Sequence, residues 1–373
     1  MFTLTIEIIE SARRGASSLR SLRERGVTFE MDEVGRLRFF VGNSAVIFPV
    51  RVDGLRYALR CYRSQTEDRE RLRAVYGADF LPSEMVIQRF DGEKYIDVAI
   101  CEWREGDTLR SVMERVFSLD HDSWKEMLRR LSASFESLAA EMLRREDWAH
   151  ADLSGENIIV DEEFRMTLID NDFNYIEALS IERGREICRA GTPAYQKRRE
   201  REYGAEMDNF SIALISLSLR ALATDPELWF RHPFEDGLLL DGEKIGSRKY
   251  SVLDEAESIM WREGEFTGSA LSRALRFDKL GTKNLLPLFE FSTRQREVDT
   301  LALETFEELG LWGFRSSVSR EVIIPPLFDE AFDFSGGEAR VRLSRWWFYI
   351  DCEGQIVERC GDLSGRKPPK RKI

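Results

Sequence analysis

The stretch from Phe210 to Ala223 constrains the fold most, because its residues are apolar almost all the way around a helix. Three serines and Arg220 interrupt the apolar residues, so the stretch is shorter than the roughly 18 apolar residues that a membrane-spanning helix requires. A helix without a polar face is buried inside a protein core. We therefore expect a fully buried helix at residues 210–222 and no membrane span.

The composition indicates a globular protein with more than one core or with two lobes. The chain has 373 residues, of which 43% are hydrophobic and 33% charged, which excludes a wholly disordered or low-complexity chain. The net charge of −12 argues against a nucleic-acid partner. Glu7 stands where a signal peptide would need apolar residues, and no basic residue precedes it, so we expect a cytoplasmic protein.

The cysteines and histidines exclude the common metal and disulfide frameworks. The five cysteines are spread singly, at Cys61, Cys101, Cys188, Cys352 and Cys360. This pattern contains no C-x-x-C pair and argues against both a disulfide framework and a zinc cluster. Because the chain has only three histidines, any bound metal should be held by oxygen ligands.

The periodicity predicts strands, then helices, then strands again. After a short strand-like piece at the N-terminus and a helical stretch over Ser11–Glu24, strands are expected at residues 37–62 and 84–103. The turn residues Asp53-Gly54 favour a hairpin in the first of these regions. A charged helix follows at residues 66–76, and a long amphipathic helix carries apolar residues from Trp124 to Met142 at spacings of three and four.

Further along, a helix is predicted at Arg296–Leu309, with Gly310 ending it. Strands return in VIIPPLF, ARVRL and WWFYID, the last of which begins at Trp346. The basic C-terminal tail contains two prolines and is expected to be disordered. The fold class is therefore α+β, with a β-rich N-terminal part, a helical middle and a β-rich C-terminal module.

The segment from His150 to Asp172, HADLSGENIIVDEEFRMTLIDND, contains the residues that suggest chemistry. It predicts a loop, a strand at 158–160, a turn and a second strand at 166–169. Such a hairpin can bring Asp152, Asn157 and Asp170 to one edge. Two oxygen ligands, Asn157 and Asp170, suit Mg²⁺, and a third carboxylate beside them can accept a proton from an attacking hydroxyl.

This segment resembles the catalytic loop of protein kinases, H-x-D-L-x-x-x-N, with LIDND in the place of their metal-binding D-F-G. The resemblance covers roughly residues 35–225 and is closest to an atypical bacterial kinase-like family. It includes Gly191-Thr192-Pro193-Ala194-Tyr195, which is similar to the end of an activation segment, and Asp208 at the start of the buried helix. The resemblance implies a bilobal fold and an ATP- and Mg²⁺-dependent transfer of phosphate to Ser or Thr hydroxyls of proteins.

The resemblance also implies a role for each matched residue. Asp152 would orient the hydroxyl, Asn157 and Asp170 would bind Mg²⁺, and His150 and Asp208 would support the loop. The residues implied in nucleotide binding are Gly42, Asn43, Ile47, Arg60, Glu102 and Trp103. Glu70 is the first choice for the carboxylate that would pair with Arg60, and Glu67 is the second.

Three departures from the protein-kinase pattern leave other functions open. Arg60 stands where kinases have a phosphate-binding Lys, and its planar guanidinium is not equivalent to an ammonium. The phosphate loop keeps only Gly42, and Ala151 replaces the Arg that often contacts a phosphorylated activation loop. A pseudokinase that binds nucleotide or serves as a scaffold is the first alternative. A small-molecule kinase is the second, against which the Gly191–Tyr195 segment counts.

The C-terminal module is similar to the WG repeat of bacterial proteins, over about one and a half repeats around Val322–Val341. A repeat of this kind cannot bury its apolar face alone, so the module should dock on the helical lobe of its own chain or on a partner. Trp312, Trp346 and Trp347 are expected to be packing residues. The expected organisation is an N-terminal extension at 1–30, a strand-rich lobe at 31–105, a helical lobe at 106–305, the WG-repeat-like module at 306–365 and the tail at 366–373.

Overall fold

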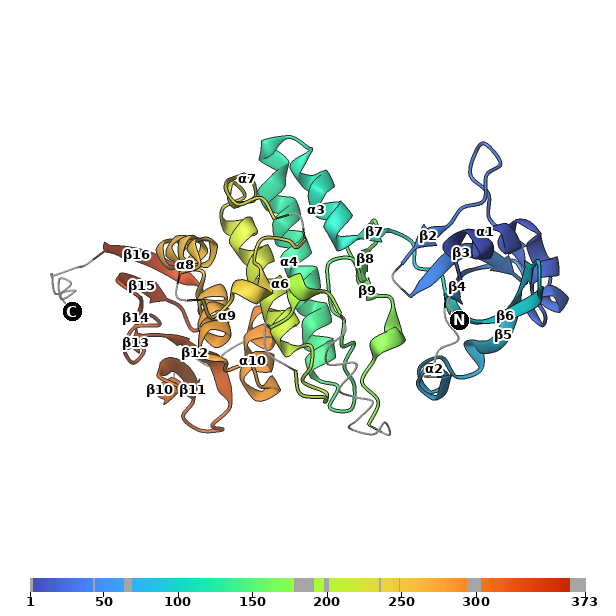
Figure 1. Ribbon diagram of the computed structural model, residues 1–373. Helices are drawn as coiled ribbons and strands as arrows, with labels where there is room; N and C mark the ends of the chain where they lie inside the picture. The colour runs from blue at the N-terminus through green and yellow to red at the C-terminus, as the bar shows by residue number, and fades with distance from the viewer. Residues whose placement is uncertain are drawn as a thin grey trace. The chain divides into compact units, whose positions relative to one another are not determined.

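The structure is a computed structural model that describes residues 3–42, 44–63, 69–177, 191–197, 201–234, 236–247, 249–293 and 303–362. The chain divides into two compact units, Met1–Glu105 and Gly106–Ile373. Strands dominate the N-terminal region, helices the middle and strands the C-terminal region, which confirms the α+β class (Figure 1). No helix in the described part of the chain combines the length and the apolar character that a membrane crossing needs.

The N-terminal unit is built on an antiparallel sheet in the order β1-β3-β4-β6-β5, with β2 also paired to β3. Its strands are β1 Thr28–Phe29, β2 Phe40–Val41, β3 Ala45–Val52, β4 Leu55–Tyr62, β5 Phe80–Arg89 and β6 Gly92–Glu102. The predicted turn at Asp53 and Gly54 joins β3 to β4, and both residues have positive φ, 52° and 82°. Such a two-residue turn matches the twist of the strands that it connects.

Short helices cover this sheet. They are α1 Thr5–Arg13, α2 Arg69–Tyr76 and the 3₁₀ turns Gly15–Ser18, Leu22–Arg25 and Gly77–Asp79. The strand expected at the N-terminus is wrong, because residues 5–13 form a helix. Ile8, Ile9 and Ala12 lie on one helical face and are buried in the same core as β3–β6, while Glu7 accepts a hydrogen bond from the backbone N–H of Leu4 (2.8 Å). Tertiary burial therefore overrode the strand preference of the β-branched residues.

Helices form most of the second unit. They are α3 Leu109–Phe117, α4 His121–Leu143, α6 Asn209–Thr224, α7 Leu228–Arg231, α8 Ser251–Glu263, α9 Phe266–Phe277 and α10 Thr282–Thr293. The 3₁₀ turns Asn171–Phe173, Pro193–Tyr195 and Gly242–Lys244 and a small sheet of β7 Asp107–Thr108, β8 Ile158–Val160 and β9 Met166–Leu168 complete the region. The predicted helices at 124–142 and 210–222 are confirmed as α4 and α6, which pack along each other.

Arg220, the one charge in the apolar stretch of α6, is neutralised inside the unit. Its guanidinium pairs with Glu136 of α4 (2.8 Å) and with Glu265, the residue before α9. Glu265 also caps α9 by accepting a hydrogen bond from the backbone N–H of Gly268. The ion pairs therefore tie α4, α6 and α9 together through a charge that would otherwise be costly to bury.

The seven strands of the C-terminal region form two small sheets. The first contains β10 Leu303–Glu308, β11 Leu311–Ser316 and β12 Val322–Phe328, and the second contains β13 Glu330–Ala331, β14 Ala339–Leu343, β15 Trp346–Ile350 and β16 Ile356–Asp362. Phe266 of α9 makes edge-to-face contacts with Phe328 (4.9 Å) and Phe348 (5.3 Å). The module therefore shares its core with the helices of its own chain, and Figure 1 shows it beside α8–α10.

The helix predicted at Arg296–Leu309 is wrong over its described part. Residues 303–308 form β10, which pairs with β11, and residues 296–302 lie outside the described residues. Leu309 and Gly310 both have positive φ, 53° and 77°, and make the two-residue turn of the hairpin. Gly310 is thus a hairpin residue and not a helix stop, because cross-strand pairing decided the conformation.

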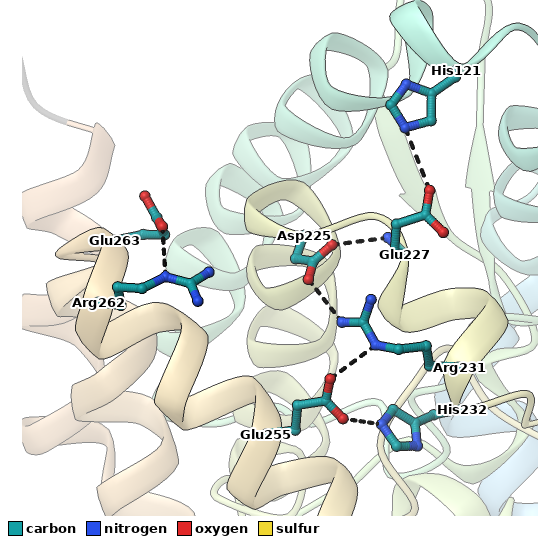
Figure 2. A network of polar contacts seen from close by, with 8 residues as sticks. All are labelled: His121, Asp225, Glu227, Arg231, His232, Glu255, Arg262 and Glu263. Carbon is teal, nitrogen blue, oxygen red and sulfur yellow. Dashed lines mark hydrogen bonds and ion pairs between the residues drawn. The ribbon is translucent and has the colours of Figure 1, made fainter.

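A polar network fixes the short helix α7 (Figure 2). Arg231 pairs with Asp225 (2.7 Å) and Glu255 of α8 (2.9 Å), and His232 Nε2 lies 2.6 Å from the second oxygen of Glu255. The hydrogen bond with His232, together with the nearby charge of Arg231, lowers the pKa of Glu255 below its ordinary value of 4.5. Glu255 therefore connects α8 to α7 in its charged form.

Replacing Glu255 should produce a pH-dependent loss of stability. At pH 7 we expect Glu255→Gln to lower the free energy of unfolding by roughly 0.5 kcal/mol, the range for partly exposed ion pairs. The pKa of Glu255 is lower in the folded state than in the unfolded chain. Its contribution to the free energy of unfolding is therefore complete above about pH 4.5 and is lost as the pH falls through the folded-state pKa. Urea unfolding at a series of pH values measures this. The exposed Glu141→Gln on α4 is the control, and a difference between Glu255→Gln and wild type that persists at pH 2 would contradict the assignment.

Candidate functional site

The predicted hairpin is present and brings Asn157 next to the residue before Asp170. β8 pairs with β9 in the register Ile158 opposite Leu168, and the backbone N–H of Ile169 donates to the carbonyl of Asn157 (3.0 Å). Asn157 therefore precedes one strand and Asp170 follows the other, at the same end of the hairpin. Both residues are half-buried.

A buried carboxylate supports the loop that leads to this hairpin. Asp208, which is 3% exposed, accepts hydrogen bonds from the backbone N–H groups of His150 and Ala151 (2.9 Å for Ala151). Ala151 has a φ of 66°, a left-handed conformation that costs a non-glycine residue of the order of 1 kcal/mol or more. Burial raises the pKa of Asp208, and the two N–H donors and His150 act in the opposite direction.

His150 and Arg201 hold the same loop from two other sides. The His150 ring is fully buried, and its Nε2 lies 2.7 Å from the carbonyl oxygen of Ile169, which links the loop to the end of β9. Arg201 donates to the carbonyl of Ala151 (2.6 Å). Sequence reasoning missed Arg201, because nothing in the charged run around it distinguishes this arginine from its neighbours.

Asp152 is oriented by two segments that are far apart in the sequence. Its Oδ1 accepts hydrogen bonds from the backbone N–H (2.9 Å) and the hydroxyl (3.2 Å) of Thr192, and its Oδ2 accepts one from Asn157 Nδ2 (3.2 Å). Asn157 Nδ2 also donates to the Asp152 carbonyl (2.8 Å). The Asp152 carboxylate is therefore fixed in direction, and it remains half-buried.

The approach of Thr192 to Asp152 requires a glycine before it. Gly191 has a φ of 103°, and a Cβ atom there would lie 2.9 Å from Asp152 Oδ1 and closer still to the side chain of Gln196. Tyr195, at the end of the 3₁₀ turn that follows, is anchored because Ser211 of α6 donates to its carbonyl (2.8 Å). Burial raises the pKa of Tyr195 to about 12, so its hydroxyl stays neutral.

The donor set at the end of the hairpin fits a hard divalent cation. Asn157 uses its amide nitrogen to hold Asp152, which leaves its amide oxygen as an acceptor, and Asp170 adds a carboxylate. Asp170 has a φ of 63° and a ψ of 58° at the entry to the 3₁₀ turn Asn171–Phe173. Oxygen ligands of this number suit Mg²⁺, which keeps several non-protein ligands. Among the described residues, no group of three or more His, Cys, Asp or Glu side chains could hold a metal ion.

The residues predicted in the N-terminal unit lie on and around β3, β4 and β6. Arg60 of β4 is only 5% exposed and has Ile47 of β3 and Ala99 of β6 as cross-strand neighbours. The alternation along β4 places Arg60 on the sheet face opposite to Leu59 and Cys61. Arg60 is thus a nearly buried cation within this sheet, and its part in nucleotide binding stays a prediction.

The other residues predicted in this unit are more exposed. Gly42 donates its N–H to Ala45 (3.0 Å) and has ordinary van der Waals space for a side chain, so its conformation does not demand glycine. Glu102 is exposed at the end of β6 and pairs with Arg104 (2.9 Å). Glu70 is exposed on α2, and its pairing with Arg60 stays a prediction. Asn43 and Glu67 lie outside the described residues.

Trp103, which follows β6, belongs to an aromatic and cationic cluster. The Arg56 guanidinium lies 4.3 Å from the centroid of the Trp103 ring, and the ring of Phe40 lies 6.0 Å away. Arg56 is itself paired with Glu30 (2.7 Å) and Glu105 (2.5 Å), which raises its pKa. This cluster fixes the position of the chain at the end of the N-terminal unit.

No protein-family model and no curated protein sequence matches this chain. The chemistry of the site therefore has to be argued from its own residues.

Removing the Asp208 acceptor should loosen the loop. Asp208→Asn replaces one acceptor oxygen by an amide that faces an N–H donor, so we expect a loss of about 2 kcal/mol in unfolding free energy. The backbone amides of His150 and Ala151 should exchange faster by at least tenfold, as measured by hydrogen exchange with mass spectrometry. Asp225→Asn, at the other end of α6, is the control. Unchanged exchange in the loop of a folded Asp208→Asn protein would refute the bracing role.

Proposed function

We propose that the protein is an ATP- and Mg²⁺-dependent phosphotransferase that resembles protein kinases and acts on Ser or Thr hydroxyls of a protein. One observation carries the proposal. The Asp152 carboxylate is oriented by Asn157, Asp170 follows β9 at the same end of the hairpin as Asn157, and the buried carboxylate of Asp208 braces the loop just before Asp152. In protein kinases a carboxylate positions the attacking hydroxyl while an amide and a second carboxylate hold Mg²⁺.

Each of these side chains has a distinct task in the proposed reaction. Asp152 would accept a hydrogen bond from the attacking hydroxyl and take its proton as the hydroxyl oxygen bonds to the γ-phosphorus of ATP and the bond from that phosphorus to the β–γ bridging oxygen breaks, releasing ADP. Asn157 and Asp170 would hold Mg²⁺ through their oxygens. The cation, when bound, neutralises charge on the phosphate oxygens. Because Asn157 also orients Asp152, the proton acceptor and the metal ligands are held in one arrangement, and positioning supplies much of the rate enhancement.

The Gly191–Tyr195 segment favours a protein over a small molecule as the substrate. Thr192 contacts the proposed base directly, and Tyr195 is anchored to α6 through Ser211. An ordered segment next to the base offers backbone groups to an extended peptide, which a small hydroxyl compound would not need. In this proposal Gly42, Ile47, Arg60, Glu102 and Trp103 of the N-terminal unit contribute to nucleotide binding, with Arg60 as the cation for phosphate.

A second candidate, a pseudokinase that binds nucleotide without transferring phosphate, is favoured by the burial of Arg60. A guanidinium that is 5% exposed in a sheet can hold a phosphate in one geometry, but it lacks the compact charge of an ammonium that follows a moving phosphoryl group. The two candidates share nucleotide binding and differ in turnover. The two experiments that follow separate them.

Nucleotide binding should stabilise the protein in a Mg²⁺-dependent manner. With ATP and Mg²⁺ at a hundredfold excess over the dissociation constant, the free energy of unfolding should rise by about 2.7 kcal/mol. Asp170→Ala should lose this gain, because it removes a proposed metal ligand. A thermal-shift titration measures both. Asp161→Ala in the β8–β9 turn, where the carboxylate is half-buried and pairs with Arg165 (2.7 Å), is the matched control, and an absence of any shift with nucleotide would reject the proposal.

Removing the proposed base should abolish transfer and spare binding. We expect Asp152→Asn to keep the thermal shift with ATP and Mg²⁺ and to lose at least a hundredfold in phosphate transfer to a Ser- and Thr-containing peptide library, since general-base catalysis contributes factors of about 10² to 10⁴. Mass spectrometry of the products measures transfer. Binding without transfer in the wild-type protein would favour the pseudokinase, and loss of nucleotide affinity in Asp152→Asn would contradict the role given to this residue.

A further inference from the structure

The two faces of the sheet formed by β13–β16 differ in character. Ala339, Val341 and Leu343 of β14 are buried in the core that the module shares with the helices. The alternating residues Arg340 and Arg342 point to the opposite face, where Trp347 of β15 lies directly across from Arg342. This opposite face is half-buried at most, and we call it the outer face of the module.

Arg340 on the outer face is held between two aromatic rings. Its guanidinium carbon lies 4.4 Å from the centroid of Phe332 and 4.4 Å from that of Trp347. The two rings also lie close to each other (6.0 Å), so the guanidinium and both rings form one cation–π cluster. The ring of Phe332 is itself 47% exposed.

The charge of Arg340 is not compensated within the described residues. Its side chain makes no ion pair and no hydrogen bond there, and its Nε is buried without a partner. Comparable arginines of the same unit are paired. Arg342 pairs with Glu330 (2.6 Å), Arg315 with Glu304 (2.7 Å) and Arg273 with Asp329 (2.9 Å). Arg340 is thus a donor beside two rings that has no anionic partner among the described residues.

A recess adjoins the stacked pair. Trp347 is part of the lining of a cavity of about 680 Å³, to which Trp261 and Phe277 also contribute. Trp347 was expected to be a packing residue, and its ring also contacts the Arg340 guanidinium. The outer face therefore combines a cation that is unpaired among the described residues with an exposed aromatic ring, and the recess lies beside it, between the module and α8 and α9.

We propose that Phe332, Arg340 and Trp347 form a docking site for an acidic peptide segment of a partner protein. A Glu or Asp carboxylate of the segment would pair with the N–H edge of Arg340, which matches a carboxylate in bidentate geometry. An apolar side chain next to it would pack on the exposed ring of Phe332. The site contains no residue of the proposed phosphotransferase and does not rest on that function.

The charges around the site favour a carboxylate over a phosphate or a nucleic acid. Binding of a nucleic-acid strand draws on several unpaired cations along its path, whereas the neighbouring Arg342 is neutralised by Glu330. Phosphorylated motifs are generally met by clusters of arginine. One unpaired guanidinium fits one monoanionic carboxylate.

The test uses the full chain immobilised on beads and synthetic peptide libraries. In the first library a central Glu is flanked by apolar residues and the other positions are randomised, and in matched libraries the centre is Gln or phosphoserine. Labelled oligothymidylate is the nucleic-acid probe. We expect the wild-type protein to retain the Glu library about tenfold better than the Gln library, the factor of a charge-assisted hydrogen bond.

Variants then assign the retention to Arg340. Arg340→Met preserves apolar packing between the rings and should abolish the preference for Glu, while Arg340→Lys, which keeps the charge but not the planar fork, should reduce it. Arg315→Met is the matched control, because Arg315 also lies near a ring, that of Phe306 (5.5 Å), but is ion-paired. If Arg340→Met does not fold, Arg340→Lys tests the proposal instead, through the same ratio of Glu-library to Gln-library retention.

Three results would overturn the proposal. They are equal retention of the Glu and Gln libraries by the wild-type protein, an unchanged preference in a folded Arg340 variant, and stronger Arg340-dependent retention of phosphoserine peptides or oligothymidylate. The last result would assign the outer face to phosphate ligands.

Discussion

The contact between Asp208 and the backbone of His150 and Ala151 is the constraint on which the candidate site depends. Ala151 has a left-handed conformation that a residue with a Cβ adopts only when its surroundings impose it. Asp208 stabilises this conformation because its two carboxylate oxygens accept hydrogen bonds from the backbone N–H groups of His150 and Ala151. Arg201 donates a hydrogen bond to the carbonyl of Ala151. The next residue is Asp152, so the direction of its carboxylate is set by the conformation that the brace enforces.

The brace works because α6 is rigid and central. Asp208 stands immediately before this helix, whose residues from Asn209 to Leu219 are all buried. Toward its other end, Arg220 joins the helix to α4 and to the start of α9 by ion pairs. Ser211 of the same helix anchors the Thr192 segment through the carbonyl of Tyr195. The buried helix and the residue before it therefore position both the loop that leads to Asp152 and the Thr192 segment that contacts it, and the apolar stretch and the polar site are parts of a single arrangement.

Sequence reasoning was most successful where the deciding interactions are local. Hairpin signals placed β3, β4, β8 and β9, and the apolar periodicity placed α4 and α6, because turn residues and helix faces are short-range features. It was wrong at residues 5–13, where packing on the core of β3–β6 decided the outcome, and at residues 303–308, where pairing with the neighbouring strand β11 did. The residues of the loop could be located, but the hydrogen bonds of Thr192 and Arg201 to it could not, because those residues lie 40 and 50 positions away in the chain.

The C-terminal module shows how strand alternation can separate stability from recognition. The inward residues of β14 and β15 join the core around Phe266, so the fold depends on them and few substitutions there would be neutral. The outward residues do not contribute to that core. Among them, Arg340 lies against the rings of Phe332 and Trp347 and has no anionic partner among the described residues. If only stability mattered, contact with one ring would be enough to hold the Arg340 side chain at the surface. A neighbouring carboxylate would then neutralise its charge, as Glu330 neutralises Arg342. Because Arg340 lies against two rings and has no anionic partner among the described residues, an external anion explains the arrangement better than the stability of the module does.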